Sequence, residues 1–162
     1  MEAQKSVVDS LNDLLKENCD AKRGYRKAAE QLDDPSLKGL FMNLSEQRDN
    51  FKKIIREEIL SLGGTPQAFR QVDGPIQDAF TQPHLPLVLN SIEKSLSVCL
   101  RLEVNALQQL KKKLAEYEVK ESIPQLLTAQ LENIRLTLLD LTASATASDA
   151  TLNSCYCRSR SS

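Results

Sequence analysis

The fold is decided by two consecutive stretches, Leu11–Leu32 (LNDLLKENCDAKRGYRKAAEQL) and Leu37–Leu62 (LKGLFMNLSEQRDNFKKIIREEILSL). Apolar residues recur in both stretches with a period close to 3.6 residues, which predicts two amphipathic helices. The intervening Asp33–Ser36 supplies an aspartate that favours a helix N-cap and a proline that suits a first helical turn. Because this connection is so short, we expect the two helices to pack as an antiparallel hairpin.

The second half of the chain predicts another hairpin of the same kind. The apolar period continues through two further segments joined by a short connection, and Ser122 followed by Pro124 marks the start of the last helix. The expected helices span about 6–32, 36–62, 87–119 and 122–143.

A proline-containing link, residues 63–86, joins the two hairpins and begins with Gly63-Gly64. At roughly 3.3 Å per residue this link reaches some 65 Å, whereas the second helix, at 1.5 Å per residue, is about 40 Å long. The link is therefore long enough to return along the bundle, which permits the second and third helices to run parallel, as in ferritin-like folds. We expect an all-α, ferritin-like four-helix bundle over residues 1–145, with two antiparallel hairpins joined by a crossover link.

The charge balance gives no electrostatic reason to expect nucleic acid or an anionic membrane as a partner. The 162 residues include 21 lysines and arginines against 22 acidic residues. No apolar run approaches the roughly 20 residues that span a bilayer, and Met1–Ser10 lacks the apolar core of a signal peptide. We therefore expect neither a nucleic-acid partner nor a membrane-spanning segment.

The four cysteines match no zinc-binding spacing. Cys19 and Cys99 fall in predicted helices, whereas Cys155 and Cys157 fall in a serine-rich tail, residues 146–162, which is predicted to be disordered. Scattered thiols are typical of a reducing compartment, so a cytoplasmic location is expected.

Polar residues interrupt the apolar faces near the middle of the predicted bundle. Counting about 100° per residue places one or two of them on the inward side of each helix. Heights measured from the two hairpin turns predict a shared polar layer of Asn18, Gln47, Arg48, Glu103 and Thr137, with Gln130 about two turns away.

This layer has two interpretations. A buried charge needs a partner, so we expect Arg48 to pair with Glu103 and to fix helix register, as a polar core position does in a coiled coil. The alternative is a ligand or di-metal site. Against a metal, Glu46-x-x-Asp49 points away from the apolar face and the one histidine, His84, lies in the link. No catalytic residue and no metal ligand is predicted.

Several motifs in the first hairpin resemble a known family, the bacterial ferritin-like four-helix-bundle proteins of unassigned function called domain of unknown function 2383. They are Leu11–Leu15 (LNDLL), Gly24–Glu30 (GYRKAAE), Asp34–Phe41 (DPSLKGLF), Gln47-Arg48 and Leu62–Pro66 (LGGTP). The resemblance implies a ferritin-like fold and a loose association with stress response, but no established activity. It covers about Leu11–Pro66 well, is weaker over the later helices, and does not extend to the tail.

The chain departs from the family pattern in its second half. Where the resemblance implies an acidic residue in the third helix and a histidine in the fourth, this chain has Leu96 and Leu138. Two functions therefore remain. The preferred one is a non-catalytic helical bundle without a cofactor that acts through its surface or as a homo-oligomer. The alternative is a divergent iron- or manganese-binding carboxylate protein.

Overall fold

The computed structural model describes the backbone of residues 2–70, 74–81 and 89–160, and the side chains of these residues except 81, 89–91 and 143–160. Within these ranges the chain is all-α, as predicted, and contains no strand. The described helices are α1 (Glu2–Gln31), α2 (Pro35–Ser61), α3 (Pro75–Thr81), α4 (Leu89–Leu114) and α5 (Ser122–Arg160). None of them combines the length and apolar character that crossing a membrane requires.

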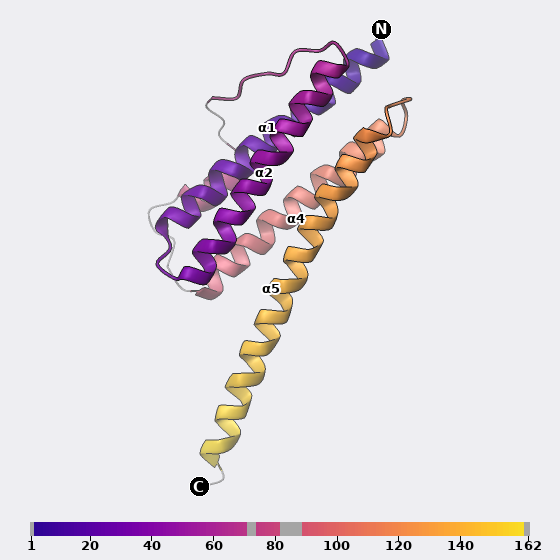
Figure 1. Ribbon diagram of the computed structural model, residues 1–162. Helices are drawn as coiled ribbons and strands as arrows, with labels where there is room; N and C mark the ends of the chain where they lie inside the picture. The colour runs from indigo at the N-terminus through magenta and orange to yellow at the C-terminus, as the bar shows by residue number, and fades with distance from the viewer. Residues whose placement is uncertain (1, 71–73, 82–88, 161–162) are drawn as a thin grey trace.

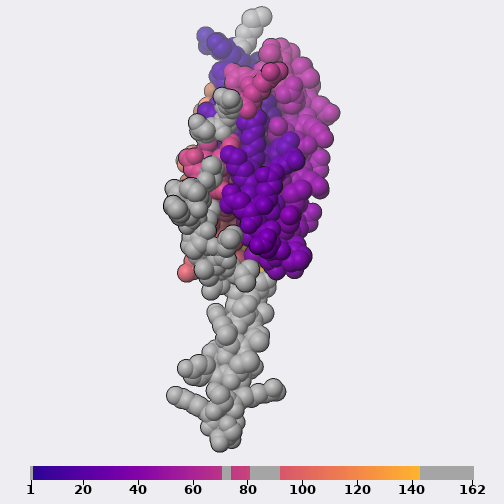
Figure 2. Space-filling model, turned by 90° about the vertical axis from the view of Figure 1, so that its left-hand side faces the viewer, coloured from indigo at the N-terminus to yellow at the C-terminus, as the bar shows by residue number. Residues whose placement is uncertain are grey.

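The four long helices form two hairpins (Figure 1). Helices α1 and α2 run in opposite directions and contact each other along their length. Helices α4 and α5 are also antiparallel and in contact, but the C-terminal part of α5 extends beyond α4. Helices α2 and α4 run in the same direction, because the chain returns along the bundle between them. Figure 2 shows α1 and α2 side by side from the face on which this return takes place.

The first hairpin begins and ends where its local signals predict. The Asp34 carboxylate accepts a hydrogen bond from the Leu37 N–H at 3.0 Å, and Pro35 occupies the first turn of α2. At the other end Gly63 adopts a φ of +77°, and the Gly64 N–H donates to the Ile59 carbonyl at 3.0 Å. A left-handed residue at this place closes a helix C-terminus, and glycine adopts that conformation without strain.

The C-terminal ends of α4 and α5 differ from those predicted from the sequence. Helix α4 ends at Leu114 instead of near residue 119. Beyond Leu114 the backbone turns more tightly than an α-helix, since the Tyr117 N–H donates to the Leu114 carbonyl three residues back instead of four. Helix α5 continues to Arg160 instead of ending near residue 143. No proline or glycine follows Pro124 in the sequence, so no residue in this stretch breaks the helix. The backbone of residues 146–160, for which the composition predicted disorder, is thus described as part of α5. The side chains of 143–160, Cys155 and Cys157 included, and residues 161–162 lie outside the described residues.

A short additional helix, α3, fastens the link to α1. The Asp20 carboxylate is buried and accepts hydrogen bonds from the backbone N–H groups of Ile76 at 3.1 Å and Gln77 at 3.0 Å. Opposite Ile76 stands Gly24, where an added Cβ would lie 2.8 Å from the Ile76 carbonyl carbon and oxygen. Glycine is therefore required at this position for α3 to approach α1 so closely.

The core is mainly aliphatic, with one aromatic cluster where α1, α2 and α3 meet. Tyr25, Phe41 and Phe80 are each at most 1 % exposed. Their ring centroids are 5.3 to 6.2 Å apart, and Phe41 and Phe80 meet edge to face. The cluster thus ties the link to the first hairpin, and through the Tyr25 hydroxyl it borders the polar residues of the mid-core.

Candidate functional site

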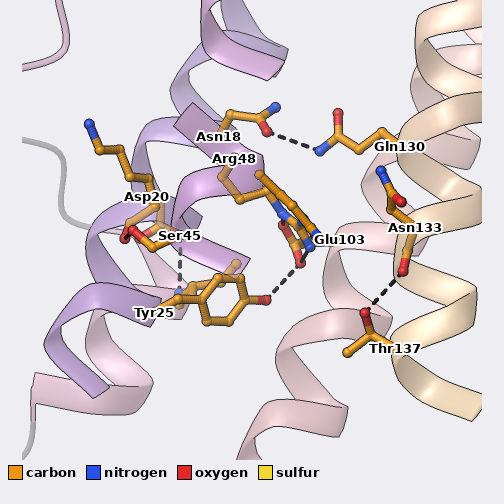
Figure 3. Close-up of polar contacts among 12 residues, drawn as sticks. Asn18, Asp20, Tyr25, Ser45, Arg48, Glu103, Gln130, Asn133 and Thr137 are labelled. Atoms are coloured by element: carbon orange, nitrogen blue, oxygen red, sulfur yellow. Dashed lines mark hydrogen bonds and ion pairs between the residues drawn. The ribbon is translucent and has the colours of Figure 1, made fainter. Parts of the chain in front are cut away.

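A buried ion pair joins the two hairpins at the centre of the bundle (Figure 3). Arg48 of α2 is 0 % exposed and Glu103 of α4 is 8 % exposed. The Arg48 Nε lies 2.7 Å from Glu103 Oε1, and its Nη2 lies 2.9 Å from Oε2. The guanidinium therefore engages both carboxylate oxygens in the two-pronged geometry that makes Arg–carboxylate pairs strong.

Tyr25 of α1 completes this group. Its hydroxyl donates to Glu103 Oε2 at 2.7 Å, and the Arg48 guanidinium carbon lies 5.6 Å from the centroid of its ring. Burial, and next the charge of Glu103, raise the pKa of Tyr25 well above its usual value. The phenol thus stays protonated as a hydrogen-bond donor.

The Glu103 carboxylate stabilises the charged form of Arg48. Burial acts to lower the pKa of Arg48, but the Glu103 carboxylate beside it outweighs this effect and raises that pKa above its ordinary value. Arg48 is therefore cationic at every physiological pH, and its charge is compensated by a carboxylate rather than by water.

Of the residues predicted to share the polar layer, the structure brings Arg48, Glu103 and Gln47 together. The Gln47 Oε1 lies 3.5 Å from Arg48 Nη1, at the limit of a hydrogen bond. The expected pairing of Arg48 with Glu103 is confirmed. Thr137 is different, because its hydroxyl donates within α5 to the Asn133 carbonyl at 3.0 Å.

Asn18 contacts a residue that the heights had placed two turns away. The Gln130 Nε2 donates to the Asn18 Oδ1 at 3.0 Å, and both side chains are at most 2 % exposed. The predicted separation of Gln130 from Asn18 is thus wrong. The predicted position of each residue along the bundle axis was counted from the turn within its own hairpin. Because no short turn connects α1 to α5, this counting does not fix the register of α5 against α1.

A cavity of about 500 Å³ lies beside the ion pair, between α1, the start of α3, α4 and α5. Its wall carries the carboxylates of Asp13, Glu17, Asp20 and Glu103, and the amides of Asn18 and Gln130. Glu17 is exposed at the outer edge of this cavity, but the cavity wall removes part of the water around its carboxylate. This desolvation, followed by the charges of Asp13, Glu103 and Asp20, raises the pKa of Glu17 to about 7. Glu17 is not among the site residues predicted from the sequence, although acidic residues at 13, 17 and 20 share one face of a helix at spacings of four and three.

The residues of the mid-core do not fit a metal ion. Among the side chains that the structure describes, no three from His, Cys, Asp and Glu stand close enough together to hold one. Both oxygens of Glu103 are engaged by a cationic guanidinium, and both oxygens of Asp20 accept backbone N–H groups. A cation at this level would have to displace Arg48 from its carboxylate.

The two described cysteines are unsuited to act as nucleophiles. Cys19 and Cys99 are both buried and free. Burial, and next the charge of Glu103, raise the pKa of Cys99 to about 12, so its thiol stays protonated. Cys99 is therefore a packing residue of α4.

Comparison with known proteins places the chain in a family without a described activity. No curated protein matches it. A family model described as "Domain of unknown function (DUF2383)" matches residues 6–116, which include most of α1 and all of α2, α3 and α4. Because this match covers more than half of the sequence, the chain belongs to the DUF2383 family.

Proposed function

We propose that the protein is a non-catalytic, ferritin-like four-helix bundle in which an ion pair takes the place of a metal centre and fixes the register of two hairpins. The observation that carries this proposal is the two-pronged bond between Arg48 and Glu103. A buried charged pair stabilises a fold little compared with apolar residues, but it penalises every register in which the partners are separated. The parallel course of α2 and α4 supports the ferritin-like assignment.

Metal analysis tests the non-catalytic half of the proposal. Protein purified without a chelator, and then incubated with Fe(II) or Mn(II) and desalted, is expected to retain far less than one metal ion per chain by mass spectrometry. The Glu103→Ala variant, treated in parallel, is expected to match the wild type. Stoichiometric iron or manganese that is lost in Glu103→Ala would overturn the proposal in favour of a divergent carboxylate metalloprotein.

We further propose that the bundle acts through its surface, by self-association. Leu136 and Leu139 of α5 are 51 % and 65 % exposed, and their spacing of three places them on one face of the helix. Large apolar side chains that share an exposed face are typical of surfaces that bind another protein. A homo-oligomer formed through α5 would cover this face.

Light scattering over a range of protein concentrations tests self-association. The wild type is expected to gain mass with concentration, whereas the double variant Leu136→Gln with Leu139→Gln is expected to remain a monomer. Leu60→Gln is the matched control, because Leu60 is equally exposed but lies on α2. A wild type that stays strictly monomeric at high concentration removes this part of the proposal.

A further inference from the structure

The cavity beside the ion pair has properties that a role in helix register does not require. Its volume of about 500 Å³ lies within the range of small-molecule sites. One wall is apolar, formed in part by Leu102 and Leu107 of α4, while the α1 wall is acidic. Gln130 of α5 contributes an amide to the same cavity.

The orientation of the Gln130 amide follows from its neighbours. The Asn18 Nδ2 donates to the Leu14 carbonyl at 2.9 Å, so the Asn18 Oδ1 must face Gln130 as an acceptor. Gln130 therefore presents its Nε2 to Asn18 at 3.0 Å, and its Oε1 is left as an acceptor. This oxygen is buried and has no hydrogen-bond partner among the residues that the structure describes. A buried acceptor without a partner is costly, and a ligand that carries an N–H or O–H group would satisfy it.

The charges of the cavity differ between its inner end and its rim. At the inner end, Arg48 compensates Glu103, and the backbone of α3 engages Asp20. At the rim, Asp13 and Glu17 are exposed acidic residues of α1. Among the described residues that line the cavity, Lys16 is the one basic residue, and it is exposed. The rim thus favours a cation, whereas the inner end offers a neutral acceptor and favours a neutral donor.

We infer that this cavity binds a short amino alcohol, with the ammonium group at the acidic rim and the hydroxyl donating to Gln130 Oε1. The alkyl chain of such a molecule lies against Leu102 and Leu107. A simple monoamine would leave the Gln130 oxygen without a donor. A diamine would bury a second charge at the inner end, where Glu103 is already paired with Arg48 and both oxygens of Asp20 already accept backbone N–H groups.

Titration of wild-type protein with 4-aminobutan-1-ol, followed by amide chemical shifts in NMR spectra, tests the inference on the full chain. Saturable shifts are expected for cavity residues of α1, α4 and α5. Butan-1-amine, which lacks the hydroxyl, is expected to bind about 3- to 10-fold more weakly, as for the loss of one hydrogen bond. Butane-1,4-diol, without the charge, and 4-hydroxybutanoate, with the opposite charge, are expected to give no saturable shifts. Equal binding of all four probes would overturn the inference.

Substitution of Gln130 separates the contribution of the ligand's hydroxyl group to binding from that of its ammonium group. Gln130→Leu is expected to weaken 4-aminobutan-1-ol about 3- to 10-fold and to leave butan-1-amine unchanged, because only the former donates to the amide. Gln125→Leu is the matched control, since Gln125 is an exposed glutamine of the same helix. If Gln130→Leu weakens both probes equally, the hydroxyl does not contact this residue and the assignment is wrong.

The pH dependence of binding tests the rim. The groups that face Glu17 are Asp13, Asp20 and Lys16 on its own helix and Glu103 on α4; the described parts of α3 and α5 add no titratable side chain to the cavity wall. Because the pKa of Glu17 is about 7, its carboxylate is charged at pH 8 and largely neutral at pH 6. Amino alcohol affinity is therefore expected to fall as the pH is lowered from 8 to 6.

Two variants check this rim assignment without altering the inner end. Glu17→Gln is expected to abolish the change between pH 6 and pH 8 and to weaken binding about 2- to 5-fold at pH 8, whereas Glu30→Gln, at the exposed far end of α1, is expected to do neither. Ala106→Met, which fills the α4 wall, is expected to block binding. A wild-type affinity in Ala106→Met would place the ligand elsewhere. None of these outcomes depends on the mass measured by light scattering, so the inference fails or stands apart from self-association.

Discussion

The Glu103→Leu variant is expected to lose about 3–5 kcal/mol of unfolding free energy, because Arg48 would remain buried without its counter-ion. Arg48 is 0 % exposed, so its charge cannot reach water without opening the bundle. The Tyr25 hydroxyl would lose its acceptor in the same change. For a domain of this size the loss corresponds to a fall in Tm of roughly 6–20 °C. Urea denaturation followed by circular dichroism measures it.

The double variant Arg48→Met with Glu103→Leu is expected to recover most of this stability, since removal of both charges leaves none unpaired. Asp49→Ala is the matched control for loss of a carboxylate. Asp49 pairs with Lys22 at 2.8 Å, but both side chains are about 30 % exposed, and the expected cost is below about 1 kcal/mol. If Glu103→Leu costs no more than Asp49→Ala, the pair is not the buried contact described.

The double variant also tests whether the pair specifies register. If it is as stable and as soluble as the wild type, and if it keeps the same oligomeric state and one cooperative transition, then the pair specifies nothing that apolar residues cannot supply. If the double variant instead remains soluble but unfolds in a poorly cooperative transition, loss of a unique helix register is the physical cause.

The first hairpin could be predicted from the sequence because its signals are local. An apolar period, the Asp34 cap and the Gly63 end act within a few residues, and they place α2 within one residue of its observed bounds. The end of α5 could not be predicted in this way. A helix without breaking residues has no local stop, and composition alone favoured a disordered tail there.

The candidate site was predictable only where a physical rule forces a contact. A buried arginine demands a carboxylate, and Glu103 was the one on an inward face, so the pair with Arg48 followed. The contact between Asn18 and Gln130 depends on the register of the two hairpins, that is, on their relative position along the bundle axis. Because that register is a tertiary property, helical counting placed Gln130 at the wrong height along the bundle.

The second large effect is expected from Phe80→Ala, which should cost about 3–5 kcal/mol. Phe80 is 1 % exposed and its ring contacts Tyr25 of α1 and Phe41 of α2. Truncation leaves a cavity where three elements meet, and the helices cannot collapse into it without losing their other contacts. Denaturation measures the total cost. Hydrogen exchange is expected to show the earliest loss of protection in α3, whose place against α1 depends on this ring.

Phe69→Ala is the matched control, because Phe69 lies in the same link but is only partly buried. The Arg23 guanidinium bonds to the Phe69 backbone carbonyl at 2.6 Å, a contact that alanine keeps, so the expected cost is about 1 kcal/mol. Equal costs for the two variants would mean that the link is a passive tether between hairpins. A much larger cost for Phe80→Ala would mean that the link is part of the core. In that case α3 forms a fixed wall of the cavity, through Ile76, instead of a movable cover.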